Sequence, residues 1–552
     1  MSDGQASSLP APLAAAWGWI DRNFLSLGRE VRLTFLPPLM IYVAYGIQGL
    51  TAIAGQFFVK DYLGLSAEFL AALGFWVGIP WALKMPVGHL VDLMWERKGG
   101  LVYFGAALLA ASLAIMIGLL ADRAAMERFM DADAWFVVAA LLAPIGYVLQ
   151  DAVADAMTVE AVPRLDEAGR ALPEGDVKRM HITMQTLGRV ALIGGLVLVA
   201  GLNVWLFSGV EKMAEGEKVA IYRQVYTMAL AIPVVSILGV LLAGILRRRN
   251  ARRLVARGFT RAQADAMLNP HPEPPPVNWW ILGGGLAFAA VSLSVGLGKV
   301  PGAQEIVFGA SMAIVLVLIW RLVRELSPDA RVTLVGTALV IFVFRALPGP
   351  GTGYSWWTID ILKFDQQFLA KLGLIANVLT LVGLFLFRRF MAEKSIAYVV
   401  GFLTIVGTIL ALPTIGMYYG LHEWTARHTG GVVDARFIAL VDTALESPLG
   451  QVAMVPMLAW IARCAPDKLK ATYFAVMASF TNLALSASAL GTKYLNQVYT
   501  VSREVKDQAT GAIKVAQDYS QLGELLLISV AIGFLLPMLA IVFVKTTRFR
   551  SA

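Results

Sequence analysis

The sequence predicts an all-α protein embedded in a membrane, and three observations carry that prediction. Of its 552 residues, 58% are apolar and only 15% are charged, and the mean hydropathy is +0.68. Soluble domains carry about 25% charged residues. The apolar residues gather in runs of about twenty, the length that an α-helix needs to cross a hydrocarbon core. Because lipid offers no hydrogen-bond partner to an open backbone, each run must be helical.

Fourteen apolar runs follow one another along the chain. They lie near 35–58, 68–91, 101–121, 134–157, 181–207, 222–246, 278–298, 302–320, 332–347, 367–387, 395–417, 435–461, 471–495 and 522–544. With a cytoplasmic N-terminus, the inside segments hold 28 lysines and arginines and the outside segments hold 11. This bias follows the positive-inside rule. We therefore expect both termini in the cytoplasm, and we attribute the net charge of +8 to topology rather than to nucleic-acid binding.

A basic, proline-rich stretch divides the chain into two halves. It opens with RRRNARRLVARGFTR and closes with NPHPEPPP, which is too polar to span a membrane. Residues 13–33 interleave aromatic and basic residues, as expected either of an amphipathic segment on the membrane surface or of a solvated tail. The expected organisation is a cytoplasmic segment 1–34, a six-helix bundle 35–246, a cytoplasmic linker 247–277, two inserted helices 278–325 and a second six-helix bundle 326–552.

The two halves contain an internal repeat. VKDYLGLSAEFLAALG (59–74) aligns without gaps on TIDILKFDQQFLAKLG (358–373), with 7 of 16 positions identical. In each half the segment is an outside loop that enters the second span. Parallel repeats of this kind are typical of the major facilitator architecture, whose two bundles bind a solute between them.

Ionisable residues inside membrane spans are functional candidates, because a charge there is costly unless it faces a cavity or a partner. Lys84 shares a helix face with Gly88 and Asp92 at spacings of four residues. Lys84 is expected either to reach a cavity or to extend toward the cytoplasm. Gly88 is expected to let a neighbouring helix approach closely, and Asp92 to pair with basic residues at the cytoplasmic mouth, where Arg97 begins the loop. The alternative for this motif is a purely structural latch.

Asp151 and Asp155 lie one turn apart near the cytoplasmic end of the fourth predicted span. Two carboxylates this close cannot both ionise freely, so one is expected to bind and release a proton, as proton coupling requires. The alternatives are pairing with Arg189 on the next span, or simple exposure at the helix end. Glu160, one further turn along, is expected in solvent.

The second half carries its own charged and aromatic residues. Asp442 and Glu446 repeat the spacing of four, and Arg345 is expected to contact an anion or to pair with Asp442. Trp356 and Trp357 are expected to be interfacial anchors. In the first half, Trp76 and Trp81 line the second span and are candidates for stacking on a ring, together with Phe75.

Several function classes are excluded by what the sequence lacks. The single cysteine, Cys464, allows no intramolecular disulfide, and the five histidines have no HxxxH or HExxH spacing. The sequence contains no Walker motif, catalytic triad or nucleotide-binding fingerprint. We therefore expect neither an enzyme nor a bound metal or cofactor.

Four blocks of sequence resemble the folate–biopterin transporters, the BT1 family of the major facilitator superfamily. They are FFVKDYLGLSAEFLAALG with GIPWALKMPVGHLVD, QDAVADAMTVE, RALPGPGTGYSWWTIDILKFDQQFLAKLG, and VAMVPMLAWIARCAPDKLKATYFAVMASFTNLALSASALG. Together they cover most of the chain. The sequence departs from the family pattern at Met85, Val91, Ala152 and Lys470.

The resemblance implies a secondary transporter of folate or pterin solutes, driven by protons in symport. We also expect a monomer in a bacterial inner membrane. A carboxylate can accept the adjacent N–H and amino group of a pterin, and cationic side chains suit a glutamyl tail. The candidate substrate-binding residues are Lys84, Asp155, Arg189, Arg345, Asp442, Trp76 and Trp81, with Asp151 and Asp155 for proton coupling. The alternatives are transport of another solute, such as a muropeptide, sugar or drug, and a non-transporting membrane assembly factor.

Overall fold

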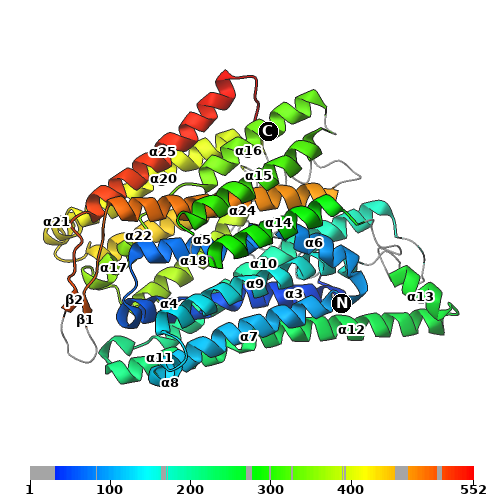
Figure 1. Cartoon of the computed structure of the whole chain (residues 1–552), viewed down its shortest axis with the longest axis horizontal. Helices are drawn as coiled ribbons and strands as arrows, with labels where there is room; N and C mark the ends of the chain where they lie inside the picture. The colour runs from blue at the N-terminus through cyan, green and yellow to red at the C-terminus, as the bar shows by residue number, and fades with distance from the viewer. Residues whose placement is uncertain are drawn as a thin grey trace, which may run out of the picture.

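The computed structural model describes most of the chain. The described residues are 31–82, 84–162, 170, 172–268, 277–297, 300–324, 327–387, 390, 393–453, 470–506 and 513–551. Long helices run side by side along the long axis of the molecule (Figure 1). The helix α13 lies at the right-hand end of this view, whereas α8, α21 and the short β1–β2 pair lie at the left-hand end. The predicted segment 13–33 falls almost wholly outside the described residues.

The first half and its linker form helices that match the predicted spans closely. The described helices are η2 (Leu33–Phe35), α3 (Leu36–Gly46), η3 (Ile47–Thr51), α4 (Ala52–Phe58), η4 (Val59–Leu63), α5 (Ala67–Ala82), α6 (Lys84–Leu93), η5 (Trp95–Arg97), α7 (Gly99–Ala121), α8 (Arg123–Glu127), α9 (Ala132–Ala161), α10 (Glu174–Leu206), η6 (Val210–Lys212), α11 (Glu215–Ala229), α12 (Ala231–Ala256) and α13 (Arg261–Leu268).

The remainder of the chain continues in the same way. Its described elements are α14 (Trp279–Leu297), α15 (Ala303–Val323), α16 (Pro328–Arg345), α17 (Thr352–Asp360), α18 (Gln366–Leu386), α20 (Ile396–Tyr418), α21 (Leu421–His428), α22 (Ala435–Glu446), η7 (Ser447–Leu449), α24 (Lys470–Val498), β1 (Val505–Lys506), β2 (Ile513–Val515) and α25 (Leu522–Thr546). The strands β1 and β2 pair antiparallel. The helix α17 occupies a stretch where the sequence predicted a loop.

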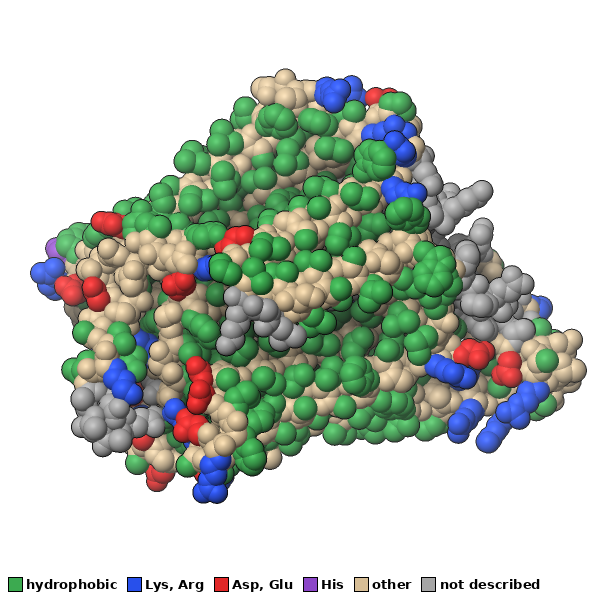
Figure 2. All heavy atoms as spheres, viewed as in Figure 1, with side chains coloured by type: hydrophobic (Ala, Val, Ile, Leu, Met, Phe, Trp, Pro, Cys, Tyr) green, Lys and Arg blue, Asp and Glu red, His purple; other side chains and the backbone are tan. Residues whose placement is uncertain are grey.

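Among the described residues, eleven helical stretches are long and apolar enough to cross a membrane. They coincide with eleven of the fourteen predicted spans. The predicted spans 332–347 and 471–495 correspond to the helices α16 and α24, and the described part of 435–461 holds α22. Charged side chains gather near the ends of the molecule, and the middle is largely apolar on its surface (Figure 2). An apolar belt of this kind is what contact with lipid requires.

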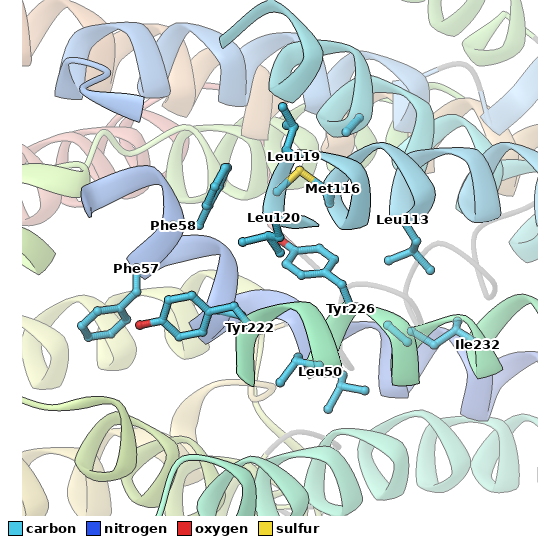
Figure 3. Packing of buried hydrophobic residues seen from close by; sticks show 14 of the residues in the cluster. Leu50, Phe57, Phe58, Leu113, Met116, Leu119, Leu120, Tyr222, Tyr226 and Ile232 are labelled. Atoms are coloured by element: carbon cyan, nitrogen blue, oxygen red, sulfur yellow. The ribbon is translucent and has the colours of Figure 1, made fainter. Parts of the chain in front are cut away.

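The core of the first bundle is built from aromatic and aliphatic side chains of several helices. Phe57 and Phe58 of α4, Leu120 of α7, and Tyr222 and Tyr226 of α11 are buried together (Figure 3). This packing holds α4, α7 and α11 in place around α3 and α9, which carry the polar residues discussed below.

The two repeat copies share their local backbone geometry. Gly64 has a φ of 69°, and its aligned partner Lys363 has a φ of 56°, which is the only positive φ of a non-glycine residue among those described. Two residues later each copy caps a helix: Ser66 Oγ accepts from the backbone N–H of Phe69, and Asp365 Oδ1 accepts from that of Phe368. The same turn followed by the same cap therefore opens the second span of each half.

The inserted helices α14 and α15 pack against both halves. At the first half, the backbone N–H of Asn278 donates to His89 Nε2 at 2.9 Å. Gly285 of α14 lies so close to Pro86 of α6 that a Cβ at Gly285 would overlap the proline ring. On the second half, Lys493 Nζ of α24 lies 3.1 Å from Glu305 of α15. The inserted pair therefore bridges α6 and α24.

An interbundle latch joins the two halves near the end that carries β1 and β2. Lys60 Nζ lies 2.7 Å from Asp360 Oδ1, and Tyr519 donates its hydroxyl to Asp360 Oδ2 at 2.6 Å. Arg503 donates to the backbone carbonyl of Val59 at 2.9 Å. We call Lys60, Asp360, Tyr519 and Arg503 the interbundle latch. Its residues come from the repeat turns and from the segments that flank the strands.

Candidate functional site

The side chain of Lys84 lies between two carboxylates of α9. Its Nζ is 2.6 Å from Asp151 Oδ2 and 2.8 Å from Asp155 Oδ2. Tyr42 of α3 donates its hydroxyl to Asp155 Oδ1 at 2.7 Å. Three helices that are distant in sequence thus contribute to one polar cluster inside the first bundle. Lys84 is the first residue of α6, and the spacing of four brings both carboxylates to one face of α9.

The cluster of Lys84, Asp151 and Asp155 carries one positive and two negative formal charges. The side chains of Lys84 and Asp151 are 21% and 13% exposed, whereas that of Asp155 is 43% exposed. A buried charge is tolerated only when it is paired, so Lys84 neutralises one carboxylate. Protonation of the other would make the cluster neutral. Asp155 is the carboxylate more accessible to a proton or a solute.

A small pocket with aromatic walls lies beside this cluster. It is lined by Ile41, Tyr42, Tyr45, Tyr147, Gln150 and Asp151. The ring of Tyr45 meets that of Tyr147 edge to face at 5.7 Å and that of Trp81 at 5.6 Å. The pocket therefore combines aromatic walls with a carboxylate and an amide, and its free space is about that of one water molecule.

Trp81 also connects the pocket with the second half. Its backbone carbonyl accepts a hydrogen bond from Asn482 Nδ2 of α24 at 3.0 Å. The neighbouring residue Thr481 accepts from Arg345 Nε at 3.2 Å through its carbonyl. Arg345 thus lies at the seam between the halves, one residue along α24 from the contact with Trp81.

Asp442 lies in a different part of the second half. Its Oδ2 accepts from Thr414 Oγ1 of α20 at 3.5 Å, and its Oδ1 is buried with no hydrogen-bond partner among the described residues. No ion pair among the described residues joins Asp442 to Arg345, so the structure does not show the expected counter-ion pair.

The structure distinguishes between several alternatives that the sequence left open in the first half. Lys84 does not extend toward the cytoplasm but is held by both carboxylates. Asp155 pairs with Lys84 and Tyr42 rather than with Arg189. Arg189 is exposed on α10 and acts on Asp151 and Asp155 only at longer range. The two carboxylates of α9 pair with a lysine of α6 because α6 packs directly against α9.

The glycine motif at the end of the second span also differs from expectation. Among the described residues, no atom lies within 4 Å of a Cβ added at Gly88, so none of the described helices makes the expected close approach there. Arg97 is exposed, in agreement with its place at the start of the loop. Glu160 is not in solvent: it lies 2.7 Å from Lys98 Nζ, and Lys98 is itself buried. Lys98, the basic residue that follows Arg97 at the start of the loop, therefore pairs with Glu160.

The aromatic residues divide between pocket and core. Trp81 contacts the pocket ring of Tyr45, but Phe75 is fully buried in the core and Trp76 lies against Gly296 of α14. Trp356 and Trp357 are 2% and 4% exposed, so the expectation that they are interfacial anchors is wrong. These two tryptophans belong to a buried cluster of the second half.

Sequence reasoning missed Tyr42, Tyr45, Tyr147 and Gln150. Tyr42 and Tyr45 lie on the first span, and Tyr147 and Gln150 lie on the fourth, so one helical turn separates the members of each pair. Gln150 also directly precedes Asp151 in the sequence. The one-turn spacing of polar and aromatic residues on these two spans was the available signal for the pocket. Within the described residues, no group of three or more His, Cys, Asp or Glu side chains could hold a metal ion.

Comparison with known proteins shows which family the chain resembles. The model of the BT1 family matches residues 304–549. This match covers less than half of the chain and is a resemblance to that family. A folate-biopterin transporter of Synechocystis sp. is 24% identical over 471 residues, which are 84% of this chain and 74% of that protein. With eleven membrane-length helical stretches among its described residues, the chain is a multi-pass integral membrane protein.

Solved structures show the fold of this chain. A POT family transporter in complex with 5-aminolevulinic acid matches with a TM-score of 0.57 at 12% identity, over 94% of this chain and 96% of that one. The nucleoside transporter NupG matches with a TM-score of 0.52 at 12% identity, over 93% and 99%. The expected fold class, a major facilitator fold of two six-helix bundles with two extra helices between them, is confirmed.

Proposed function

We propose that this chain is a transporter of the BT1 family, which moves folate- or pterin-type solutes together with protons, by alternating access. The observation that carries the proposal is the cluster in which Lys84 holds Asp151 and Asp155 beside an aromatic pocket. The name of the Synechocystis relative supports the solute class. Intramembrane charges of this kind are costly and are kept where they bind ions or solutes.

The residues around the pocket would offer partners for a pterin ring once the helices that enclose this small space move apart. Asp151 can accept the adjacent N–H and amino group of the ring in a two-point hydrogen bond. Tyr45, Tyr147 and Trp81 supply the flat walls. Arg345 at the seam is the cation proposed to attract an anionic tail, with the exposed Arg189 as a second candidate.

The charge balance of the cluster supports proton coupling. When both carboxylates are ionised, Lys84 is shared between them and the cluster has a net charge of −1. A proton on Asp155 leaves Lys84 with Asp151 alone and removes that net charge, which lowers the cost of exposing the site to the opposite side. Asp442 is proposed as a further solute contact in the second half, where one of its oxygens is unpartnered among the described residues.

The proposal extends to organisation and location. The domain boundaries are proposed at residues 34, 246, 277 and 325, with both termini in the cytoplasm of a bacterial cell and the chain acting as a monomer in the inner membrane. The 28-to-11 bias of basic residues supports the orientation. No catalytic role is proposed for any residue.

Uptake into proteoliposomes tests the proposal. The purified chain is reconstituted, and the uptake of labelled folate, an uncharged pterin and a panel of peptides, sugars and nucleosides is measured with and without an inward-directed proton gradient. Accumulation of folate or pterin only with the gradient is expected. Accumulation of another solute would replace the substrate assignment. If no solute of the panel accumulates, the transport proposal is rejected in favour of an assembly role.

A charge variant tests the seam contact separately. Arg345→Gln should weaken the binding of folate by about 1.5–3 kcal/mol and leave the binding of an uncharged pterin nearly unchanged. Equal losses for the two ligands would show that Arg345 acts through its contact with α24 and not on the solute.

A further inference from the structure

The inserted helices carry a patch of arginine and tryptophan side chains at one end of the pair. The guanidinium carbon of Arg321, on α15, lies 3.6 Å from the ring centre of Trp280 on α14. That of Arg324 lies 3.7 Å from the ring centre of Trp320, one turn back along the chain. The first contact joins the last turn of α15 to the first turn of α14. We call Trp280, Trp320, Arg321 and Arg324 the arginine–tryptophan patch.

The donors of the patch have no protein partner among the described residues. Arg321 and Arg324 are both exposed, and neither guanidinium forms an ion pair or a hydrogen bond with a described residue. Stacking on an indole occupies one face of a guanidinium and leaves its N–H edge open to an oxyanion, which arginine binds through two parallel hydrogen bonds. The patch therefore presents two cations whose planes are held by tryptophan and whose donors are available.

Nearby carboxylates do not neutralise these cations. In α14 and α15 the single carboxylate is that of Glu305, which lies in the first turn of α15, far along the helix from Arg321, and pairs with Lys493. Asp329, in the first turn of α16, forms no ion pair with a described residue. The positive charge of the patch is thus left for a ligand from outside the described chain.

The tryptophans place the patch at the level of lipid headgroups. Trp280 and Trp320 are 61% and 55% exposed, and the neighbouring Trp279 is 74% exposed. They lie at the ends of two membrane-length stretches, Trp279–Gly296 and Ala303–Arg321. Exposed tryptophans at the ends of spans are typical of the boundary between hydrocarbon and headgroups. These side chains differ in this respect from the buried tryptophans of α17.

An apolar strip continues from the patch into the span. Leu286 and Leu293 are 72% and 62% exposed and follow Trp279 at spacings of seven, which places the three side chains along one face of α14. A phosphate held by the arginines would thus have acyl chains running along this strip. A soluble anion would leave the strip unused.

We propose that the arginine–tryptophan patch binds an anionic phospholipid, whose phosphate accepts hydrogen bonds from Arg321 and Arg324 and whose acyl chains lie along the exposed face of α14. Basic groups at the edge of a span attract anionic headgroups. A phosphatidylcholine headgroup carries its own cation, so it gains less from two arginines. The inference concerns the inserted pair and does not rest on the proposed solute or on proton coupling.

Lipid binding to the purified full chain in a neutral detergent tests the proposal. Native mass spectrometry measures the apparent dissociation constants of dioleoyl phosphatidylglycerol and dioleoyl phosphatidylcholine. The test variant is Arg321→Gln with Arg324→Gln, and Arg324→Gln alone is a milder form, because its stack lies within one helix. The matched control is Arg252→Gln with Arg253→Gln, which removes the same charge from exposed arginines of α12.

The wild type and the control should bind phosphatidylglycerol about tenfold more tightly than phosphatidylcholine. The double patch variant should lose that preference, and Arg324→Gln alone should lose about fivefold in affinity for phosphatidylglycerol. Phosphatidylglycerol should also raise the melting temperature of the wild type more than that of either patch variant. If the double variant does not fold, Arg324→Gln decides.

Four results would overturn the proposal. Unchanged preference in a folded patch variant would show that the arginines merely hold the two helix ends together. An equal loss in the α12 control would show diffuse attraction of anionic lipid to positive charge. A wild type that binds the two lipids equally would have no anionic site. Full displacement of phosphatidylglycerol by an excess of inorganic phosphate would assign the patch to a soluble anion.

Discussion

Lys60 Nζ lies 2.7 Å from Asp360 Oδ1, and this contact joins the repeat turn of the first bundle to the aligned region of the second. The two side chains are only 14% and 19% exposed. Arg503 contributes a further contact at this end. Its side chain is buried, and its guanidinium carbon lies 5.1 Å from the centre of the Trp356 ring. Separation of the bundles at this end must break a charge pair that is largely shielded from water.

Removal of the charge pair should open this end of the transporter. Lys60→Ala is expected to shift the equilibrium by about 1–2 kcal/mol toward the separated state, roughly a 5- to 30-fold change. The readout is the labelling rate of a cysteine placed at Gln366, which lies between the bundles, in a chain that carries Cys464→Ser. Lys218→Ala is the matched control, since Lys218 pairs with Glu215 inside one bundle. Equal labelling in both variants would contradict the latch.

The lysine of the polar cluster should matter more for folding than either carboxylate. Lys84→Gln leaves the largely buried Asp151 beside Asp155 without a cation and is expected to destabilise the protein by about 1–3 kcal/mol. Asp155→Asn leaves a neutral pair of Lys84 and Asp151, so it should fold, lose proton-driven accumulation and retain exchange of solute. Thermal unfolding in detergent measures the first effect. A Lys84→Gln, Asp155→Asn double variant no more stable than Lys84→Gln would refute the charge argument.

Two glycines of α14 allow a matched test of the inserted helices. Gly285→Val should destabilise the protein by about 1–3 kcal/mol, because the new side chain meets Pro86 of α6. Gly283→Val changes helix propensity equally, but an added Cβ there has no atom within 4 Å. The melting temperature of each variant gives the comparison. Equal melting temperatures would show that α14 does not depend on this contact.

The repeat turns offer a stabilising substitution. Lys363→Gly should raise the stability by about 0.5–1 kcal/mol, because glycine adopts a positive φ without steric cost. The reciprocal change, Gly64→Ala, should destabilise, since it introduces strain at a φ of 69° and a close contact with Val505. Melting temperatures that move in the same direction for the two variants would contradict this explanation.

Reporter fusions test the orientation. Fusions at residues 260 and 425 should report opposite sides of the membrane, with residue 260 in the cytoplasm. Residue 260 directly precedes α13 and residue 425 lies in α21, and these helices lie at opposite ends of the molecule (Figure 1). Two reporters on the same side would refute the fourteen-span topology.

The sequence predicted the spans well because hydropathy is a local property. The predicted bounds 101–121 and 522–544 differ from those of α7 and α25 by at most two residues. Prediction from the sequence failed where the packing of helices against one another decides which side chains meet. The partner of Asp155 could not be predicted, since Lys84 and Tyr42 lie on helices that approach α9 only after folding. Trp356 illustrates a second reason for failure. A tryptophan near the end of a span can be an interfacial anchor or, as here, part of a buried cluster, and the sequence pattern is the same for both.

The bridging position of α14 and α15 has a mechanical consequence. One face of this helix pair contacts α6 and α24, while Trp279, Leu286 and Leu293 on α14 are exposed in the part that is expected to meet lipid. Movement of one bundle past the other must therefore bend, slide or carry the pair through the surrounding bilayer. Part of the work of the conformational cycle is then done against lateral pressure, and the thickness and order of the lipid enter the energetics of transport.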